Sequence, residues 1–218
     1  IKKYVKVIHV DRGTVPFALY AYQEELINCY NDNRKVCSMM SRQMGKTTVT
    51  ASYFLWVVLF QSDKNVAILA NKAAMAREIL SRVKFAYENL PFWLQQGVIE
   101  WNKGSIKLDN NSRIFTAATS PNAIRGESCA YVYCDELGFV PNNIAEEFLT
   151  SVFPVLSSGS TTKIFITSTP KGMNTFYKIW TEAENGINGF VPIKALWDRH
   201  PDRDQKWYED QVKNLGPV

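Results

Sequence analysis

Short β-rich runs alternate with longer helical patterns along this chain of 218 residues, and this alternation constrains the fold more than any other feature. The run NVAILA at 65–70 is apolar after its first residue, as expected of a strand that is covered on both faces. Such alternation predicts an α/β fold with a mostly parallel sheet flanked by helices. Strands are expected at 34–40, 65–70, 130–134, 163–167 and 189–196, and helices at 47–60, 72–89 and 201–214.

The stretch 98–117 departs from this pattern. Gly104 and an Asp-Asn-Asn turn signal at 109–111 separate alternating segments, which predicts antiparallel hairpins inserted in the α/β core. The composition, 46% hydrophobic and 21% charged, is typical of a globular core, and the length suits one large domain. We therefore expect one domain over 1–218, with a small antiparallel β insertion at about 98–117.

Charge, cysteines and apolar runs narrow the functional classes. A net charge of +4 permits a nucleic-acid partner without requiring one. The four cysteines, at positions 29, 37, 129 and 134, lack C-x-x-C spacing, which favours buried thiols over a zinc site. The longest apolar run, Tyr53 to Phe60, is far shorter than the ~20 residues that span a bilayer. Because the chain begins with Ile1 and shows no signal peptide, we expect it to be a piece of a longer protein.

A candidate phosphate-binding loop joins the first core strand to the helix at 47–60. Gly45-Lys46-Thr47 matches the end of the pattern G-x-x-x-x-G-K-S/T, whereas Met40 stands at the position of the first glycine. At a strand-to-helix junction, free N–H groups and the helix dipole favour a polyphosphate. Gly45 would let the backbone approach phosphate, Lys46 would reach the β- and γ-phosphates, and the Thr47 hydroxyl would bind Mg²⁺.

An acidic pair follows a second buried strand. In YVYCDE, Asp135 and Glu136 stand at the C-terminal end of the strand, where ligands collect in open α/β sheets. A phosphoryl-transfer enzyme needs one carboxylate to hold the metal and another group to orient or deprotonate the attacking water. Because both sites occur in the right order, we interpret Met40 as a tolerated change and predict a Mg²⁺-dependent nucleotide hydrolase.

These motifs together resemble the ATPase domain of the large terminase subunit of tailed phages, which packages DNA into proheads. The resemblance runs from about Tyr20 to Trp197, and an altered first glycine with Arg and Gln inside the loop is usual in that family. The matching stretches are SRQMGKTT, YVYCDE, TSTP, LYAYQEEL, EWNKGSIKLDN, NAIRGES and GMNTFYKIW.

The resemblance implies a RecA-like core of the ASCE type, a P-loop ATPase that uses ATP and Mg²⁺. It further implies a homo-oligomeric ring that drives double-stranded DNA into the prohead. The implied partners are DNA, the portal protein and the small terminase subunit. The implied location is the host cytoplasm, transiently at the prohead portal, with no membrane association.

The resemblance also implies roles for single residues. Gln23, expected just before a helix, resembles an adenine-reading glutamine, and Arg42 resembles a residue that senses or stabilises the γ-phosphate. Nucleotide-binding residues are then Gln23, Ser41, Arg42, Gln43, Met44, Gly45, Lys46, Thr47, Thr48, Thr167, Ser168 and Thr169. Catalytic residues are Glu136, Arg42, Lys46 and Arg125, and metal ligands are Thr47 and Asp135.

Two sets of basic residues stay ambiguous. Arg125 could stabilise transition-state charge in a neighbouring subunit, contact DNA phosphate, or anchor a loop. Lys103, Lys107 and Arg113, in the expected hairpins, could contact DNA or form a solvated face.

Three alternatives remain open at this point. A superfamily-2-type helicase shares the motifs but normally has a second RecA-like domain, for which the chain shows no second α/β set. A nucleic-acid-binding protein with a degenerate loop disagrees with the intact Lys46 and Asp135. A nuclease would need clustered carboxylates, and Asp198, Asp202 and Asp204 form an acidic group without supporting strands, so one of the last two is expected to cap the final helix. We expect the family's C-terminal nuclease domain to be absent from this chain.

Overall fold

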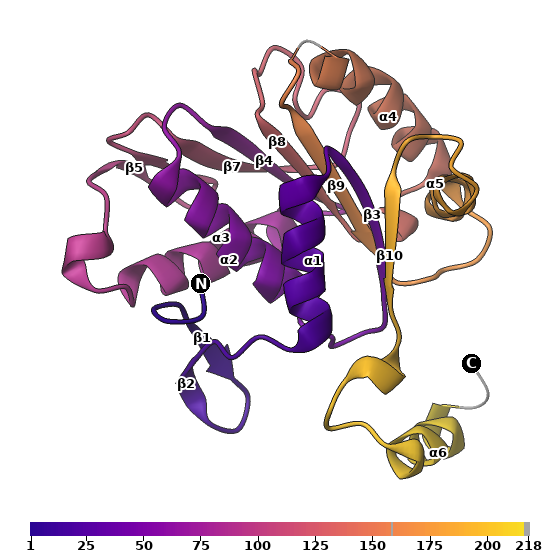
Figure 1. Cartoon of the computed structure of the whole chain (residues 1–218). Coiled ribbons are helices and arrows are strands. Elements are labelled where there is room, and N and C mark those ends of the chain that lie inside the picture. Colours follow the sequence, from indigo (N-terminus) through magenta and orange to yellow (C-terminus); the bar gives the residue numbers. More distant parts are fainter. Residues whose placement is uncertain (158, 216–218) are drawn as a thin grey trace.

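An eight-stranded sheet forms the centre of the computed structural model, which describes residues 1–157 and 159–215 (Figure 1). The strand order is β10-β3-β9-β8-β4-β7-β6-β5. All pairs from β10 to β7 are parallel, and β6 and β5 continue the sheet in antiparallel fashion at one edge. The bounds are β3 Lys35–Met40, β4 Asn65–Ala70, β5 Val98–Trp101, β6 Ser105–Leu108, β7 Arg113–Ala118, β8 Tyr131–Asp135, β9 Lys163–Ser168 and β10 Val191–Ala195.

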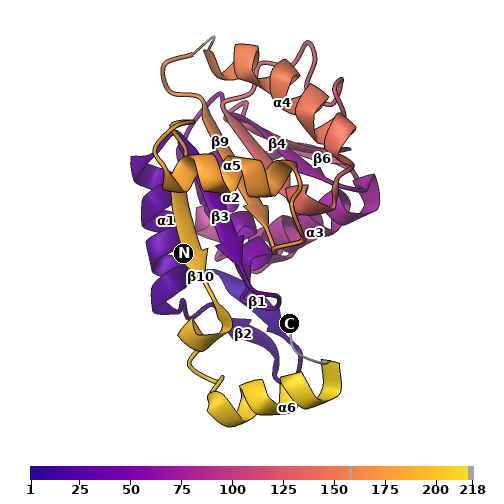
Figure 2. The same cartoon turned by 90° about the vertical axis from the view of Figure 1, so that its right-hand side faces the viewer.

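Helices cover both faces of this sheet. Helices α1, α2 and α3 pack on one face, and α4 and α5 pack on the other, as the view in Figure 2 shows. Their bounds are α1 Ala21–Asp32, α2 Lys46–Phe60, α3 Ala73–Glu88, α4 Asn142–Ser157 and α5 Thr175–Glu184. The prediction of a mostly parallel sheet flanked by helices is therefore confirmed.

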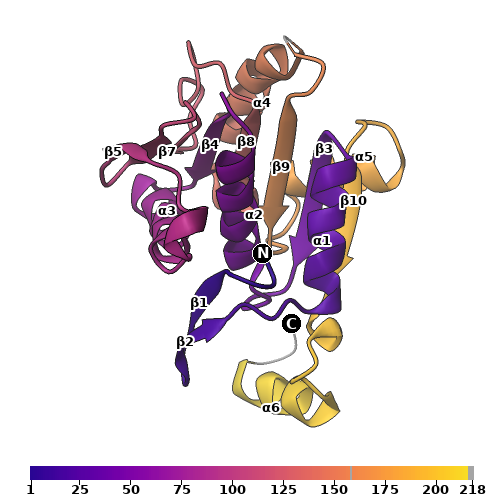
Figure 3. The ribbon, with the colours of Figure 1, turned by 60° about the vertical axis from the view of Figure 1, so that its left-hand side comes forward.

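Burial explains why the central helix and strands could be predicted from the sequence. Every residue of β8 is buried, and α2 is buried on nearly all sides because it lies between α1 and α3 (Figure 3). A helix and strands enclosed in this way require near-continuous apolar sequence. The apolar stretches thus mark the elements at the centre of the fold.

Smaller elements complete the structure. An N-terminal hairpin, β1 Lys6–His9 and β2 Gly13–Pro16, and the C-terminal helix α6 Gln205–Leu215 both lie toward the end of the sheet at which β3 and β10 finish (Figure 3). Three short 3₁₀ helices connect elements: η1 Phe92–Leu94, η2 Leu137–Phe139 and η3 Trp197–Arg199. Within the described residues, no helix is both long and apolar enough to span a membrane.

Several expected boundaries need correction. The last helix begins at Gln205 rather than Pro201, because the Asp204 carboxylate caps it by accepting a hydrogen bond from the backbone of Trp207 (2.8 Å). The last strand is shorter than expected, since it spans Val191–Ala195. Helix α4, which the sequence pattern does not predict, carries Pro154 in its interior, and an internal proline weakens a helical pattern.

The hairpins at 98–117 form, but they are continuous with the main sheet. Strand β7 pairs with β6 in antiparallel and with β4 in parallel orientation, so Ile114 lies beside Val66 in the centre of the sheet. Turn signals and alternation indicate only the pairing of strands that are neighbours in sequence. They do not show which distant strand pairs with the other edge of β7.

Candidate active site

The phosphate loop occupies residues 41–45, between the end of β3 and the start of α2. Met40, at the usual first-glycine position, is still part of β3, where it is fully buried and pairs with Ala195 on β10. The left-handed backbone positions lie later, at Gln43 (φ 59°) and Gly45 (φ 73°). Because an extended strand residue needs no glycine, a methionine is accommodated at position 40.

Gly45 is required by its surroundings as well as by its backbone. A Cβ atom at this position would lie 2.7 Å from the Gln23 side-chain nitrogen, and its φ is one that side chains disfavour. The Gln23 amide donates to the Met44 carbonyl (3.1 Å), to which the Tyr22 hydroxyl also donates (3.0 Å). The amide oxygen of Gln23 accepts from the backbone of Tyr20 (3.1 Å). Gln23 therefore supports the loop directly.

The position of Gln23 corrects one expectation. It is the third residue of α1 rather than a residue before a helix, and its side chain is buried. Its capping contact with Tyr20 fixes it there. One amide hydrogen is committed to Met44, so the second is the donor that remains for a base edge.

The first turn of α2 presents free donors. The first helical hydrogen bond runs from Val49 N to Gly45 O (3.0 Å), so the N–H groups of Lys46, Thr47 and Thr48 have no acceptor within the helix. Such a cluster of N–H groups at a helix start favours an anion. Arg82 of α3, which sequence reasoning missed, donates to the Thr48 hydroxyl (2.9 Å); no motif of the sequence marks it.

Lys46, the first residue of α2, meets Glu136, which directly follows β8. Their charged groups are 2.5 Å apart, and their side chains are 9% and 17% exposed. The other Glu136 oxygen accepts from the Thr169 backbone (3.0 Å), the Thr169 hydroxyl (3.3 Å) and the Ser168 hydroxyl (3.3 Å). The structure thus brings the phosphate loop, the acidic pair and the TSTP segment into one cluster.

The electrostatics of Glu136 favour its ionised form. Burial by itself raises the pKa of this carboxyl, but the Lys46 ammonium and the hydrogen bonds from Thr169 outweigh burial and hold the pKa below its ordinary value. Glu136 also adopts a left-handed backbone (φ 51°), which is uncommon for a residue with a side chain. The turn that follows depends on Gly138, because a Cβ there would lie 2.7 Å from the Ser168 hydroxyl.

Asp135 lies deeper and is held by two hydroxyl groups. Its Oδ1 atom accepts from Tyr133 (2.8 Å) and Thr167 (2.9 Å), whose own hydroxyls are 2.9 Å apart. Burial raises the pKa of Asp135, although these hydrogen bonds and Lys46 oppose the rise. Sequence reasoning missed Tyr133, but a side chain two residues before Asp135 on a strand shares its face, so the alternation could have indicated it.

The donor set beside the loop suits a hard divalent cation. Carboxylate and hydroxyl oxygens are the ligands that Mg²⁺ prefers, and it usually takes one or two of them together with phosphate oxygens. Asp135 ends β8, and Thr47 lies in the first turn of α2. These two residues are compatible with the predicted metal role.

Both candidate arginines are exposed to solvent. The Arg42 side chain is exposed on the loop. Arg125 lies exposed in the connection between β7 and β8, and its guanidinium forms no salt bridge within 1–157 and 159–215. By contrast, Arg203, which the sequence did not indicate, contacts the phosphate loop through two backbone carbonyls.

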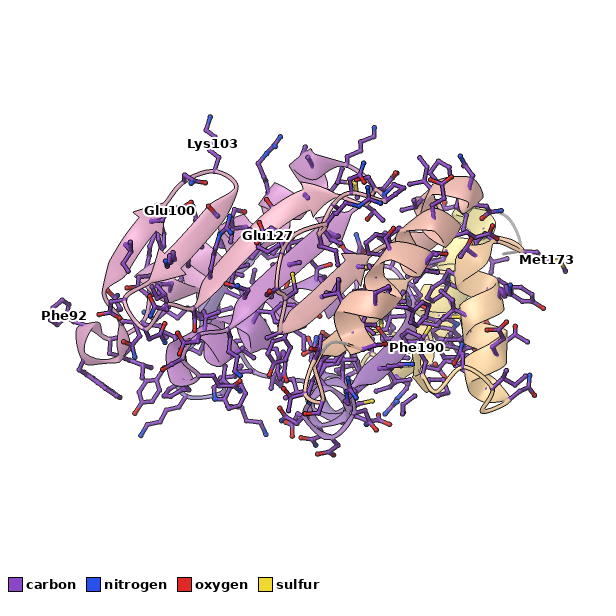
Figure 4. The ribbon with its side chains drawn as sticks, turned by 90° about the horizontal axis from the view of Figure 1, so that it is seen from above. Phe92, Glu100, Lys103, Glu127, Met173 and Phe190 are labelled. Atoms are coloured by element: carbon purple, nitrogen blue, oxygen red, sulfur yellow. The ribbon has the colours of Figure 1, made fainter. Side chains whose placement is uncertain are left out.

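The basic residues of the hairpins differ in how far their side chains are exposed to solvent. Lys103 lies exposed at the turn between β5 and β6 and points away from the body of the protein (Figure 4). Arg113 is half-buried and pairs with Glu127 (3.6 Å). Lys107 is half-buried on β6. Of these three side chains, Lys103 is the most accessible to a polyanion.

A phosphate loop on one strand, with an acidic pair at the end of a parallel strand in the same sheet, defines a P-loop nucleoside triphosphatase fold. The family model described as "Terminase large subunit, T4likevirus-type, N-terminal" matches residues 37–214. The chain belongs to this family of large terminase subunits. The resemblance stated from the motifs is thereby confirmed.

Solved structures show the same fold. A variant of the ATPase domain of the Thermus phage P74-26 large terminase superposes with a TM-score of 0.74 at 19% identity, covering 91% of this chain and 90% of that one. The HK97 bacteriophage large terminase gives 0.75 at 16% identity, covering 97% and 45%. The large terminase of a thermophilic bacteriophage, in complex with ADP, gives 0.71 at 15% identity, covering 92% and 51%.

These coverages describe the extent of the match. The chain spans nearly all of the isolated ATPase domain and about half of the two longer large terminases. The family and the fold give no support to the helicase alternative.

Proposed function

We propose that this chain is an ATPase that hydrolyses Mg-ATP and supplies the energy for packaging double-stranded DNA into a prohead. The observation that carries the proposal is the contact of Lys46 with Glu136 (2.5 Å). It brings the cation of a phosphate loop and the base of an acidic pair to one point. Related large terminases have been solved with ADP and with ATP-gamma-S, which supports a nucleotide as the ligand.

Lys46 and Glu136 suggest how binding leads to hydrolysis. A polyphosphate on the α2 N-terminus competes with Glu136 for the Lys46 ammonium. When Lys46 turns to the phosphates, Glu136 loses its cationic partner and becomes a stronger base for the attacking water. Thr47 and Asp135 would hold Mg²⁺, which would neutralise phosphate charge.

The family supports a proposal for assembly and location. We infer that copies of the chain act as a ring on double-stranded DNA, together with the portal protein and the small terminase subunit. We further propose that the working motor acts in the host cytoplasm, transiently at the prohead portal. We assign the whole chain, 1–218, to one P-loop ATPase domain.

The experiment that tests the proposal is ATP turnover by the purified chain, measured alone, with DNA, and with DNA and prohead portals. A packaging motor is expected to hydrolyse ATP faster when its track and its docking partner are both present. Turnover that portals leave unchanged would identify a general ATPase, and no turnover under any condition would refute the catalytic proposal.

We predict that Gln23→Ala relaxes the discrimination between ATP and GTP more than it lowers turnover with either nucleotide. An amide can pair with the edge of adenine, and the Gln23 amide lies against the loop through Met44. The measurement is kcat/KM for each nucleotide, with Glu24→Ala on the same helix as control. Equal losses for ATP and GTP would show that Gln23 supports the loop and does not read the base.

We predict that the activating arginine is Arg125, supplied to the site of a neighbouring subunit. An arginine directed at the γ-phosphate contributes a factor of roughly 10³–10⁵ to phosphoryl transfer. Arg125 is exposed and unpaired by salt bridges within the described residues, so it is free to reach another copy. Specific activity should therefore rise with protein concentration as subunits associate.

Mixing two inactive variants tests this prediction. Arg125→Ala retains an intact hydrolysis site, and Glu136→Gln retains the arginine, so the mixture should recover turnover that neither protein shows alone. If mixing restores nothing while Arg42→Ala alone eliminates activity, the arginine acts within its own subunit. Arg125 would then be a DNA or loop contact.

A further inference from the structure

The segment between β10 and α6 passes beside the phosphate loop, and Arg203 joins the two. One guanidinium nitrogen of Arg203 donates to the Arg42 carbonyl (3.2 Å) and contacts the Met44 sulfur (3.4 Å). The other donates to the carbonyls of Arg42 (3.3 Å) and Gln43 (3.2 Å). A single side chain, 159 to 161 residues distant in sequence, thus binds three consecutive residues of the loop.

The loop needs such support because of its backbone. Gln43 carries a side chain and yet has φ 59°, a left-handed conformation that is unfavourable for residues other than glycine. Gln23 and Tyr22 hold the Met44 carbonyl from one element, α1. Arg203, in the connection before α6, holds the carbonyls of the two preceding residues, Arg42 and Gln43. Between them, these contacts determine the orientation of the peptide groups before Gly45.

Arg203 is itself fixed in place. Its guanidinium lies 4.6 Å from the centre of the Trp207 ring, a cation–π contact, and its backbone N–H donates to the His200 carbonyl (3.0 Å). The same segment is anchored to α1 independently, because Arg199 pairs with Glu25 (2.7 Å). The guanidinium is therefore held in one geometry, and little side-chain entropy is lost when it binds the loop.

The planar, forked guanidinium group, with several N–H donors, explains why position 203 carries an arginine. Arginine presents several N–H donors in a rigid plane, so it can bind two carbonyls at once, whereas a lysine ammonium acts as a point charge. The positive charge of Arg203 beside the loop also favours a polyanion on it.

We propose that Arg203 is a positioning residue that holds the phosphate loop in its binding conformation and so raises the affinity for the triphosphate. This inference rests on the proposed nucleotide function of the loop. Arg203 acts through the carbonyls of Arg42 and Gln43 rather than on the reacting atoms. Its effect falls on ground-state binding, so KM changes more than kcat.

The test compares Arg203→Ala with Lys206→Ala, which removes an exposed cation in the first turn of α6 that does not touch the loop. Calorimetry measures the affinities for Mg-ATP and for inorganic tripolyphosphate. Arg203→Ala is expected to weaken both by about tenfold or more, while kcat at saturating ATP changes less than about threefold. Hydrogen exchange at the amides of 42–45 should become faster in Arg203→Ala and stay unchanged in Lys206→Ala.

A second variant covers the case in which Arg203→Ala unfolds. Arg203→Lys keeps the charge and much of the side-chain length, and it should still bind both ligands less tightly than the wild type because it lacks the fork. Wild-type affinity in Arg203→Lys, or in folded Arg203→Ala, would overturn the positioning role. Failure of the wild-type chain to bind ATP or tripolyphosphate would instead refute the proposed function of the loop.

Discussion

Replacement of Lys46 by alanine is expected to abolish Mg-ATP binding at accessible concentrations, a loss of at least about 100-fold in affinity. Lys46 is the buried cation at the start of α2, whereas Arg42 is exposed and Arg203 is engaged with loop carbonyls. Arg82 is likewise engaged, with the Thr48 hydroxyl, so Lys46 is the cation that we expect to offset the β- and γ-phosphate charge. Calorimetry with Mg-ATP makes the measurement.

The same substitution leaves Glu136 without its ion-pair partner. Loss of one member of a buried ion pair lowers the free energy of unfolding by about 3–5 kcal/mol. Because Glu136 keeps hydrogen bonds from Thr169 and some solvent exposure, we expect a loss of about 3 kcal/mol or less here. Thermal unfolding monitored by circular dichroism separates this effect from lost binding. Lys72→Ala, at an exposed position before α3, is the matched control. Unchanged ATP affinity in folded Lys46→Ala would refute the phosphate-loop assignment.

Replacement of Glu136 by glutamine is expected to leave ATP bound and almost unhydrolysed. The amide retains the shape of the side chain and an oxygen that can accept from the Thr169 backbone, but it cannot take a proton from water. A positioned general base contributes about 10²–10⁴-fold, so turnover should fall by that factor. Because the neutral amide no longer competes for Lys46, ATP affinity should be equal to or higher than that of the wild type.

Asp135→Asn serves as the matched comparison. This substitution should raise the Mg²⁺ concentration needed for half-maximal turnover, since it removes charge from the proposed metal ligand. Single-turnover kinetics, together with a Mg²⁺ titration, distinguish the two variants. If both proteins hydrolyse ATP at the wild-type rate, the acidic pair has no catalytic role.

The sequence predicted those parts of the candidate site that consist of neighbouring residues in a local motif. Gly45, Lys46 and Thr47 lie where the loop after β3 enters α2, and Asp135 ends β8 with Glu136 directly after it, so each half of the candidate site lies at the kind of junction that its local pattern predicted. Tyr133 was missed although the alternation of β8 could have indicated it, whereas Arg82 and Arg203 escaped because their roles depend on which element lies opposite them. No local pattern records such a contact.

By itself, the sequence determined the class of fold, the positions of most buried strands along the chain and the two motifs. Burial on both faces demands continuous apolar residues, and phosphate and metal chemistry demand particular side chains at strand ends. The tertiary structure alone decided that β7 completes the parallel sheet beside β4, that Gln23 is buried behind Met44, and that Arg203 reaches the loop from 159 to 161 residues away. These contacts arise from the packing of distant segments, and hydrogen-bond partners across such distances are set by geometry that no periodicity along the chain encodes.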